Sequence, residues 1–95
     1  MDRRARIEAT LREGLEADHV TLVDESHLHA GHAGAREGGG HFRAVIVARC
    51  FEGKSAVERQ RLVYDALAEQ MGSEIHALSM RTLTPEQWRE QRAAP

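Results

Sequence analysis

Histidines are concentrated in one short, glycine-rich stretch of this chain. Residues 26–42 read SHLHAGHAGAREGGGHF and hold four of the six histidines together with five of the eight glycines. Neutral imidazole is a good ligand for iron, copper and zinc, and a glycine-rich segment can bring it towards a metal ion. The same composition is also typical of a solvated linker. The pattern alone therefore leaves two interpretations open, a metal-binding loop and a linker.

A fifth histidine, His76, lies in the stretch EIHALSMRT. Polar and apolar residues alternate there, which predicts a β-strand with His76 on the same face as Leu78 and Met80. By itself this pattern predicts a half-buried histidine that is hydrogen-bonded to the backbone. His41 is interpreted as structural or solvent-exposed, and His19 is assigned no role.

Cys50 is the only cysteine of the chain. It excludes an internal disulfide and a CxxC site, and its position at the end of an apolar segment predicts a buried, unreactive thiol. A single cysteine also fits a reducing compartment. No apolar run approaches the roughly 18 residues of a membrane span, and the N-terminus lacks the apolar block of a signal peptide. We therefore expect a cytoplasmic protein without membrane contact.

Basic residues gather around the segment RCFEGKSAVERQR. Helix N-termini and basic side chains can bind phosphate, so this patch is a candidate nucleic-acid site. Two glutamates dilute the patch, and the net charge of −2 gives the whole chain no attraction to nucleic acid. Nucleic-acid binding is therefore the second hypothesis, carried by Arg49, Lys54, Arg59 and Arg61.

An enzymatic reading starts from HLHAGH at residues 27–32, which is similar to the HxHxDH run of metallo-β-lactamase-like hydrolases. Gly31 stands where those enzymes have an aspartate, and no second group of histidine and aspartate residues completes a zinc site. The acidic residues are spread in the pattern of solvated helix faces. The sequence therefore predicts a protein that is not an enzyme.

Hydrophobic periodicity predicts the elements that position these residues. An amphipathic helix is expected over residues 3–17, where isoleucine and leucine recur at every fourth position and Asp2 can cap the first turn. Two strands are expected at residues 19–24 (HVTLVD) and 42–51 (FRAVIVARCF). The histidine-rich stretch connects these two strands.

Capping signals predict two further helices. Ser55 and Glu58 form a capping box that opens a helix ended by Gly72. The stretch EIHALSMRT follows as a third strand, and the motif TPEQ predicts a last short helix that starts after Thr84 and runs through Trp88.

The predicted order is αββαβα. Helices and strands mixed without regular alternation indicate an α+β domain, with the helices packed on one face of a three-stranded sheet. Ninety-five residues suffice for one hydrophobic core and are too few for two, so residues 1–95 are expected to form a single domain.

Four segments together resemble the BolA family over nearly the whole chain. They are ESHLHAGHAG between the first two strands, HF at the start of the second strand, CFEGKSAVERQRLVYDAL, and IHALSMRTLTPEQW. Each is short, but their order and spacing are jointly specific. The resemblance implies a fold similar to the class II KH domain, a monothiol glutaredoxin as partner, and a [2Fe-2S] cluster ligated by both proteins.

The resemblance also assigns residues. It marks His76 as the ligand in the last strand and His29 as the ligand in the loop, with His32 as the alternative. Gln60 departs from the family, where many members have histidine. A [2Fe-2S] cluster takes four ligands, usually thiolates, so Cys50 alone cannot hold one. In the family the missing thiolates come from the glutaredoxin and its bound glutathione.

The combined interpretation is a non-enzymatic, BolA-like adaptor in iron-sulfur cluster trafficking or iron homeostasis. The alternative is a DNA-binding transcriptional regulator that uses its KH-like or helix-turn-helix face. The sequence leaves open whether the free protein forms a weak homodimer.

Overall fold

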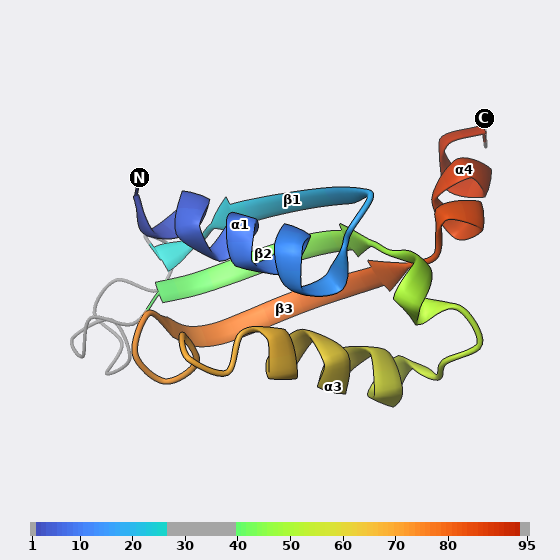
Figure 1. The fold of residues 1–95 in the computed structure, drawn as a ribbon. Helices are drawn as coiled ribbons and strands as arrows, with labels where there is room; N and C mark the ends of the chain where they lie inside the picture. The colour runs from blue at the N-terminus through green and yellow to red at the C-terminus, as the bar shows by residue number, and fades with distance from the viewer. Residues whose placement is uncertain (1, 27–39, 94–95) are drawn as a thin grey trace.

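The computed structural model describes residues 2–26 and 40–93. The elements run in the order α1 (Arg3–Leu15), β1 (His19–Asp24), β2 (Gly40–Val47), the short 3-10 helix η2 (Arg49–Phe51), α3 (Ala56–Ala66), β3 (Ile75–Leu83) and α4 (Pro85–Ala93) (Figure 1). The three α-helices and three strands confirm the predicted α+β class and the order αββαβα.

The first helix is fixed at both ends by its own residues. The side chain of Asp2 accepts a hydrogen bond of 2.8 Å from the backbone N–H of Ala5. The helix ends at Leu15, two residues before the predicted end, because Glu16 adopts a left-handed conformation and its N–H bonds to the carbonyl of Arg12. The face formed by Ile7, Leu11 and Leu15 is buried, as its spacing predicts.

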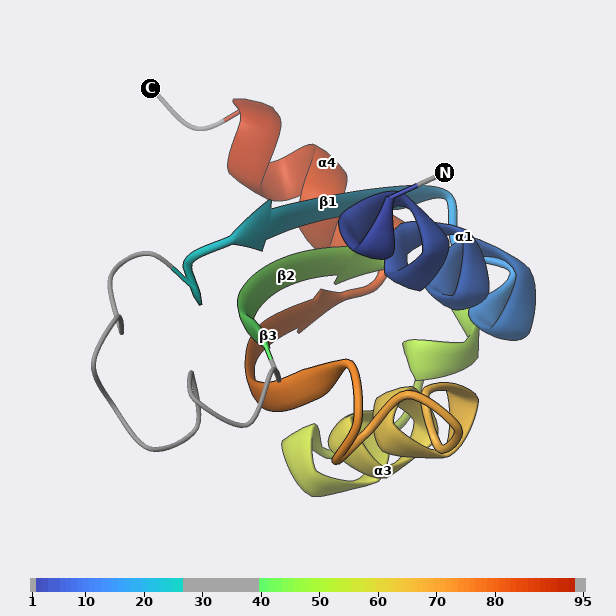
Figure 2. The same ribbon diagram turned by 90° about the vertical axis from the view of Figure 1, so that its left-hand side faces the viewer.

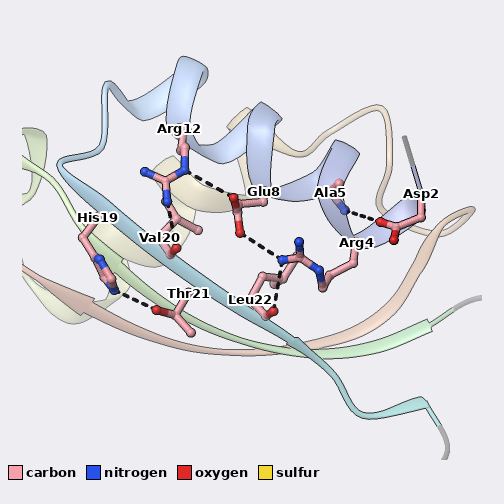
Figure 3. Close-up of polar contacts among 9 residues, drawn as sticks. All are labelled: Asp2, Arg4, Ala5, Glu8, Arg12, His19, Val20, Thr21 and Leu22. Carbon is pink, nitrogen blue, oxygen red and sulfur yellow. Dashed lines mark hydrogen bonds and ion pairs between the residues drawn. The ribbon is translucent and has the colours of Figure 1, made fainter.

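Two arginines tie this helix to the first strand (Figure 3). Arg12 donates to the carbonyl of Val20 at 3.2 Å, and Arg4 donates to the carbonyl of Leu22 at 3.4 Å. Glu8 lies between the two guanidinium groups, and the hydrogen bond from Arg4 lowers the pKa of its carboxyl. The helix is thereby held along the edge strand.

The sheet has the order β1-β2-β3, with β1 and β2 antiparallel and β2 and β3 parallel. The parallel pair requires a crossover, which η2 and α3 supply. Helices α1 and α3 lie on the same face of the sheet (Figure 2), and the core lies between them and the strands. Its buried residues are Ile7, Leu11, Leu15, Val20, Leu22, Phe42, Ala44, Ile46, Ala48, Phe51, Val63, Leu67 and Ile75.

The second strand differs from its predicted bounds at both ends. It begins at Gly40 and ends at Val47, whereas the sequence pattern extends it to Phe51. The pairing with the sheet stops after Ala48, whose N–H donates to the carbonyl of Leu83 at 3.0 Å. The chain then turns through η2, and this turn buries the Phe51 side chain completely.

The capping box of α3 is present as predicted. The N–H of Ser55 donates to the carboxylate of Glu58 at 2.8 Å, and the N–H of Glu58 donates to the hydroxyl of Ser55 at 3.2 Å. The helix ends at Ala66, earlier than the predicted end at Gly72, and a series of turns completes the connection.

Replacing Ser55 by alanine removes this cap. We expect Ser55→Ala to lower the free energy of unfolding by about 1 kcal/mol, the usual cost of losing an N-cap. Ser79→Ala, which changes an exposed serine outside any cap, is the matched control and should cost less than about 0.5 kcal/mol. Urea unfolding followed by circular dichroism measures both, and equal losses would show that the cap contributes nothing specific.

The last helix, α4, lies beyond the end of the sheet (Figure 1). The prediction that the helices pack on one face of the sheet therefore holds for α1 and α3. Thr84 and Gln87 cap α4 reciprocally, with bonds of 2.9 and 3.1 Å. The helix continues to Ala93, past the predicted end at Trp88. The indole of Trp88 stacks on the ring of His19 at a centroid distance of 4.8 Å, which attaches α4 to the start of β1.

Candidate metal-binding histidine site

The start of β2 is packed too tightly for any side chain. A Cβ atom on Gly40 would lie 2.5 Å from the ring of Phe42 and 2.9 Å from the guanidinium of Arg3. The N–H of Gly40 donates to the carbonyl of Glu74 at 3.0 Å, which brings the first residues of β2 against the residues that precede β3. Glycine at this position therefore leaves room for the Phe42 ring and the Arg3 guanidinium.

The two ends of the histidine-rich stretch are joined by hydrogen bonds. The N–H of Glu25 donates to the carbonyl of His41 at 2.7 Å, and the N–H of His41 donates to the hydroxyl of Ser26 at 3.1 Å. Ser26 and His41, which flank residues 27–39 on either side, therefore lie side by side. His27, His29 and His32 lie outside the described residues.

His76 is the extra residue of an irregularity in the parallel pair. Gly40 pairs with Ile75, and the next residue, His41, pairs with Ala77, so β3 holds one more residue than β2 at this point. Such a bulge breaks the strict alternation of a strand and re-aims a side chain. Ile75 is completely buried, while His76 beside it is exposed. The sequence pattern predicts a half-buried His76 on the face of Leu78 and Met80, and this prediction is therefore wrong.

The bulge places the His76 ring beside that of His41. The two ring centroids lie 5.3 Å apart, and the ring planes are tilted by 43°. His41 is half-buried, and its Nε2 atom is shielded from solvent. The sequence reasoning missed this pairing of two imidazoles, one fixed by its surroundings and one open to a partner.

Chain length limits how far His29 and His32 can lie from Ser26. His29 follows Ser26 by three residues, which span at most about 10 Å, and His32 follows it by six, which span at most about 20 Å. Ser26, whose hydroxyl is bonded to the backbone of His41, is the described residue nearest to both in the sequence.

Cys50 takes no part in this site. The strand between His41 and Val47 is about 20 Å long at the usual rise per residue, and Cys50 lies beyond its far end. Its Sγ atom lies 3.8 Å from the carbonyl of Leu15, and burial raises the pKa of the thiol. The side chain is half-buried and packs against the core, so it supplies neither a ready thiolate nor a ligand near His76.

The predicted basic patch is weaker in the structure than in the sequence. The guanidinium of Arg59 donates to the carbonyls of Lys54 and Thr82, at 3.0 and 3.2 Å, and lies over the ring of Phe51. It is thus occupied in joining α3 to β3. Arg49, Lys54 and Arg61 remain exposed.

Glu58 opposes phosphate binding in this patch. Hydrogen bonds from Ser55 lower the pKa of its carboxyl and keep it ionised beside the exposed cations. The patch at the start of α3 is therefore mixed in charge.

The donors at the His76 end fit partial ligation of an iron-sulfur cluster. Two histidines on one iron are an established variant of [2Fe-2S] ligation, in which cysteine thiolates complete the second iron. Within residues 2–26 and 40–93, no group of three or more histidine, cysteine or acidic side chains is arranged to hold a metal ion. The described part of the chain could therefore contribute imidazole nitrogens to such a cluster, while its one thiol, Cys50, lies away from them.

Fold and site together define a small α+β domain that presents an exposed histidine, His76, beside His41 at one end of a mixed sheet. The model of the family described as BolA-like protein matches residues 11–87. The chain belongs to the BolA family.

Relatives and solved structures agree with this assignment. BolA-like protein 1 of Homo sapiens is 43% identical over 86 residues, which cover 90% of this chain and 61% of the relative. The DNA-binding transcriptional regulator BolA of Escherichia coli K12 is 36% identical, with coverage of 90% and 78%. The solution structure of BolA1 from Mus musculus superposes with a TM-score of 0.79 at 38% identity, covering 99% of this chain and 74% of that one.

The matched region spans about three-fifths of the human protein. In the described part of this chain, no helix is long and apolar enough to cross a membrane.

Proposed function

We propose that this protein is a non-enzymatic adaptor that binds a monothiol glutaredoxin and shares the ligation of a bridging [2Fe-2S] cluster with it. The observation that carries the proposal is the exposed His76, which the bulge in β3 places beside the joined ends of the histidine-rich loop. His76 supplies one ligand and His29 the other, with His32 as the alternative.

The chain needs a partner because its own side chains cannot supply all four ligands of a cluster. Imidazole is neutral, whereas iron-sulfur clusters are usually held by thiolates. The only thiol of the chain lies at the opposite end of β2 and is protonated at neutral pH because burial raises its pKa. The glutaredoxin cysteine and the cysteine of its glutathione would supply the missing thiolates. Such a complex serves cluster trafficking or iron homeostasis, and one half-buried cysteine suits a reducing, cytoplasmic setting.

The loop ligand can be identified with three alanine variants. We expect His29→Ala to shift the visible spectrum of the reconstituted complex or to speed cluster loss several-fold, while the heterodimer persists, because protein and metal contacts are separable. The double variant with His32→Ala should lose the cluster faster still. His27→Ala is the matched control in the same segment and should resemble the parent.

Cluster loss to a chelator, followed by absorbance, measures all four proteins. If the single and double variants keep the spectrum and the loss rate of the parent, the loop has no metal role.

DNA binding is the second candidate, favoured by the name of the Escherichia coli relative. Arg49, Lys54 and Arg61 would provide the phosphate contacts. Binding of this kind weakens steeply with salt, with one counterion released per phosphate contact. Retention of the isolated protein on duplex DNA at low salt, lost on charge reversal of Arg61, would support this function, and no retention would exclude it.

A further inference from the structure

We propose that His41 and His76 together bind one divalent transition-metal ion in the free protein, without help from the loop or from a partner. Imidazole nitrogen suits zinc and copper among the common metals, and zinc is the ion with no geometric demand of its own. The site goes beyond the proposed cluster function, because its ligands come from β2 and β3 of this chain alone.

The separation of the two rings suits a shared ion. When two imidazoles bind one tetrahedral zinc ion with zinc–nitrogen distances of about 2.05 Å, their ring centroids lie about 5.2 Å apart. The centroids of His41 and His76 lie 5.3 Å apart, with the planes tilted by 43°. Rotation of the exposed His76 side chain can change the tilt between the two rings with no movement of the backbone.

The backbone beneath the pair is already fixed. His41 is held on one side by the hydroxyl of Ser26 and on the other by the β2–β3 pairing. Half-burial of the His41 ring restricts its rotamers before any metal binds. A site whose groups are ordered in advance loses less conformational entropy on binding, so even two ligands can give useful affinity.

Two protein ligands leave two positions of a tetrahedral ion open. Water fills them in the free protein, and a donor from another molecule can replace it. Because the ion would occupy His76, zinc and the proposed cluster would compete for this side chain; only this consequence depends on the proposed function.

The test removes the competing loop histidines first. In this chain carrying His27→Ala, His29→Ala and His32→Ala, titration with zinc alone by calorimetry should show one ion bound per chain. Adding His76→Ala or His41→Gln to this background should weaken zinc binding at least tenfold. Adding His19→Ala, at the far end of β1 beside Trp88, is the matched control and should change nothing.

A substitution at the half-buried His41 could also disturb the fold, so a second measurement uses the unaltered chain. Zinc coordination changes the nitrogen-15 resonance of the ligating imidazole nitrogen. We expect zinc to shift a ring nitrogen in both His41 and His76 and to leave those of His19 unshifted. A background chain that binds zinc equally well with and without His41→Gln, or an unshifted His41 ring at saturating zinc, would overturn the proposal.

Discussion

Phe51→Ala should lower the free energy of unfolding by about 3–5 kcal/mol, the range for emptying a buried aromatic site. The Phe51 side chain is completely buried where η2 turns the chain from the sheet towards α3. Its ring also lies beneath the guanidinium of Arg59, at 5.9 Å from the ring centroid. A domain of this size is stable by only about 5–15 kcal/mol, so the variant should lose a large share of its stability.

The matched control is Val57→Ala in the first turn of α3. Val57 is 55% exposed, and its truncation should cost less than about 0.5 kcal/mol. Urea unfolding monitored by far-ultraviolet circular dichroism measures both variants. A loss below about 1 kcal/mol for Phe51→Ala would show that the junction between β2 and α3 is not packed as described.

His76→Cys should lower the reduction potential of the mixed cluster complex by roughly 100 mV or more, because a thiolate replaces a neutral imidazole. His76 is exposed on its bulge, so the shorter side chain meets no packing obstacle. His76→Ala, which supplies no ligand, should instead lose the cluster to a chelator at least tenfold faster than the parent.

A cysteine placed elsewhere separates ligation from a general effect of an added thiol. His19→Cys puts the thiol at the opposite end of the sheet, where the native ring stacks on Trp88, and the potential should stay unchanged. Redox titration followed by visible absorbance measures the three complexes. If His76→Cys and the parent share one potential while the complex forms equally well, His76 is not a ligand.

The parts of the fold that could be predicted from the sequence depend mostly on interactions between residues close together in the chain. The Asp2 cap and the Ser55–Glu58 capping box act over three residues, so the sequence displays them directly, and the structure contains both. The end of β2 depends instead on where pairing with β3 stops, which is a long-range property. The alternation in FRAVIVARCF therefore extended the predicted strand past the point where Phe51 turns into the core.

The candidate site likewise combines features that local sequence displays with features that depend on long-range strand pairing. His76 was singled out through a family resemblance, but its surroundings were predicted from strict alternation, and the one-residue bulge against Gly40 and His41 reverses that prediction. The contact between His41 and His76 joins residues far apart in the sequence through a parallel strand pair. No spacing rule displays such a pair before the register of the strands is known.

The phosphate patch stays a prediction, and the structure adds the contacts of one of its members, Arg59. Sequence places it among other cations at the start of a helix, which is typical of both binding surfaces and solvated faces. The structure shows its guanidinium donating to the carbonyl of Thr82 and to Gln87, so the side chain connects α3 with the region where β3 meets α4. A charge committed to the fold is a poor candidate for recognition.

The most direct test of the adaptor proposal is native mass spectrometry, with visible absorbance, of this chain mixed with a monothiol glutaredoxin, glutathione, iron and sulfide. The account predicts a heterodimer that carries one [2Fe-2S] cluster with a spectrum distinct from that of the glutaredoxin alone, while the isolated chain stays colourless under the same treatment. A chelator-resistant, stoichiometric cluster on the isolated chain, or a mixture in which the glutaredoxin holds its cluster and this chain stays unbound, would contradict it.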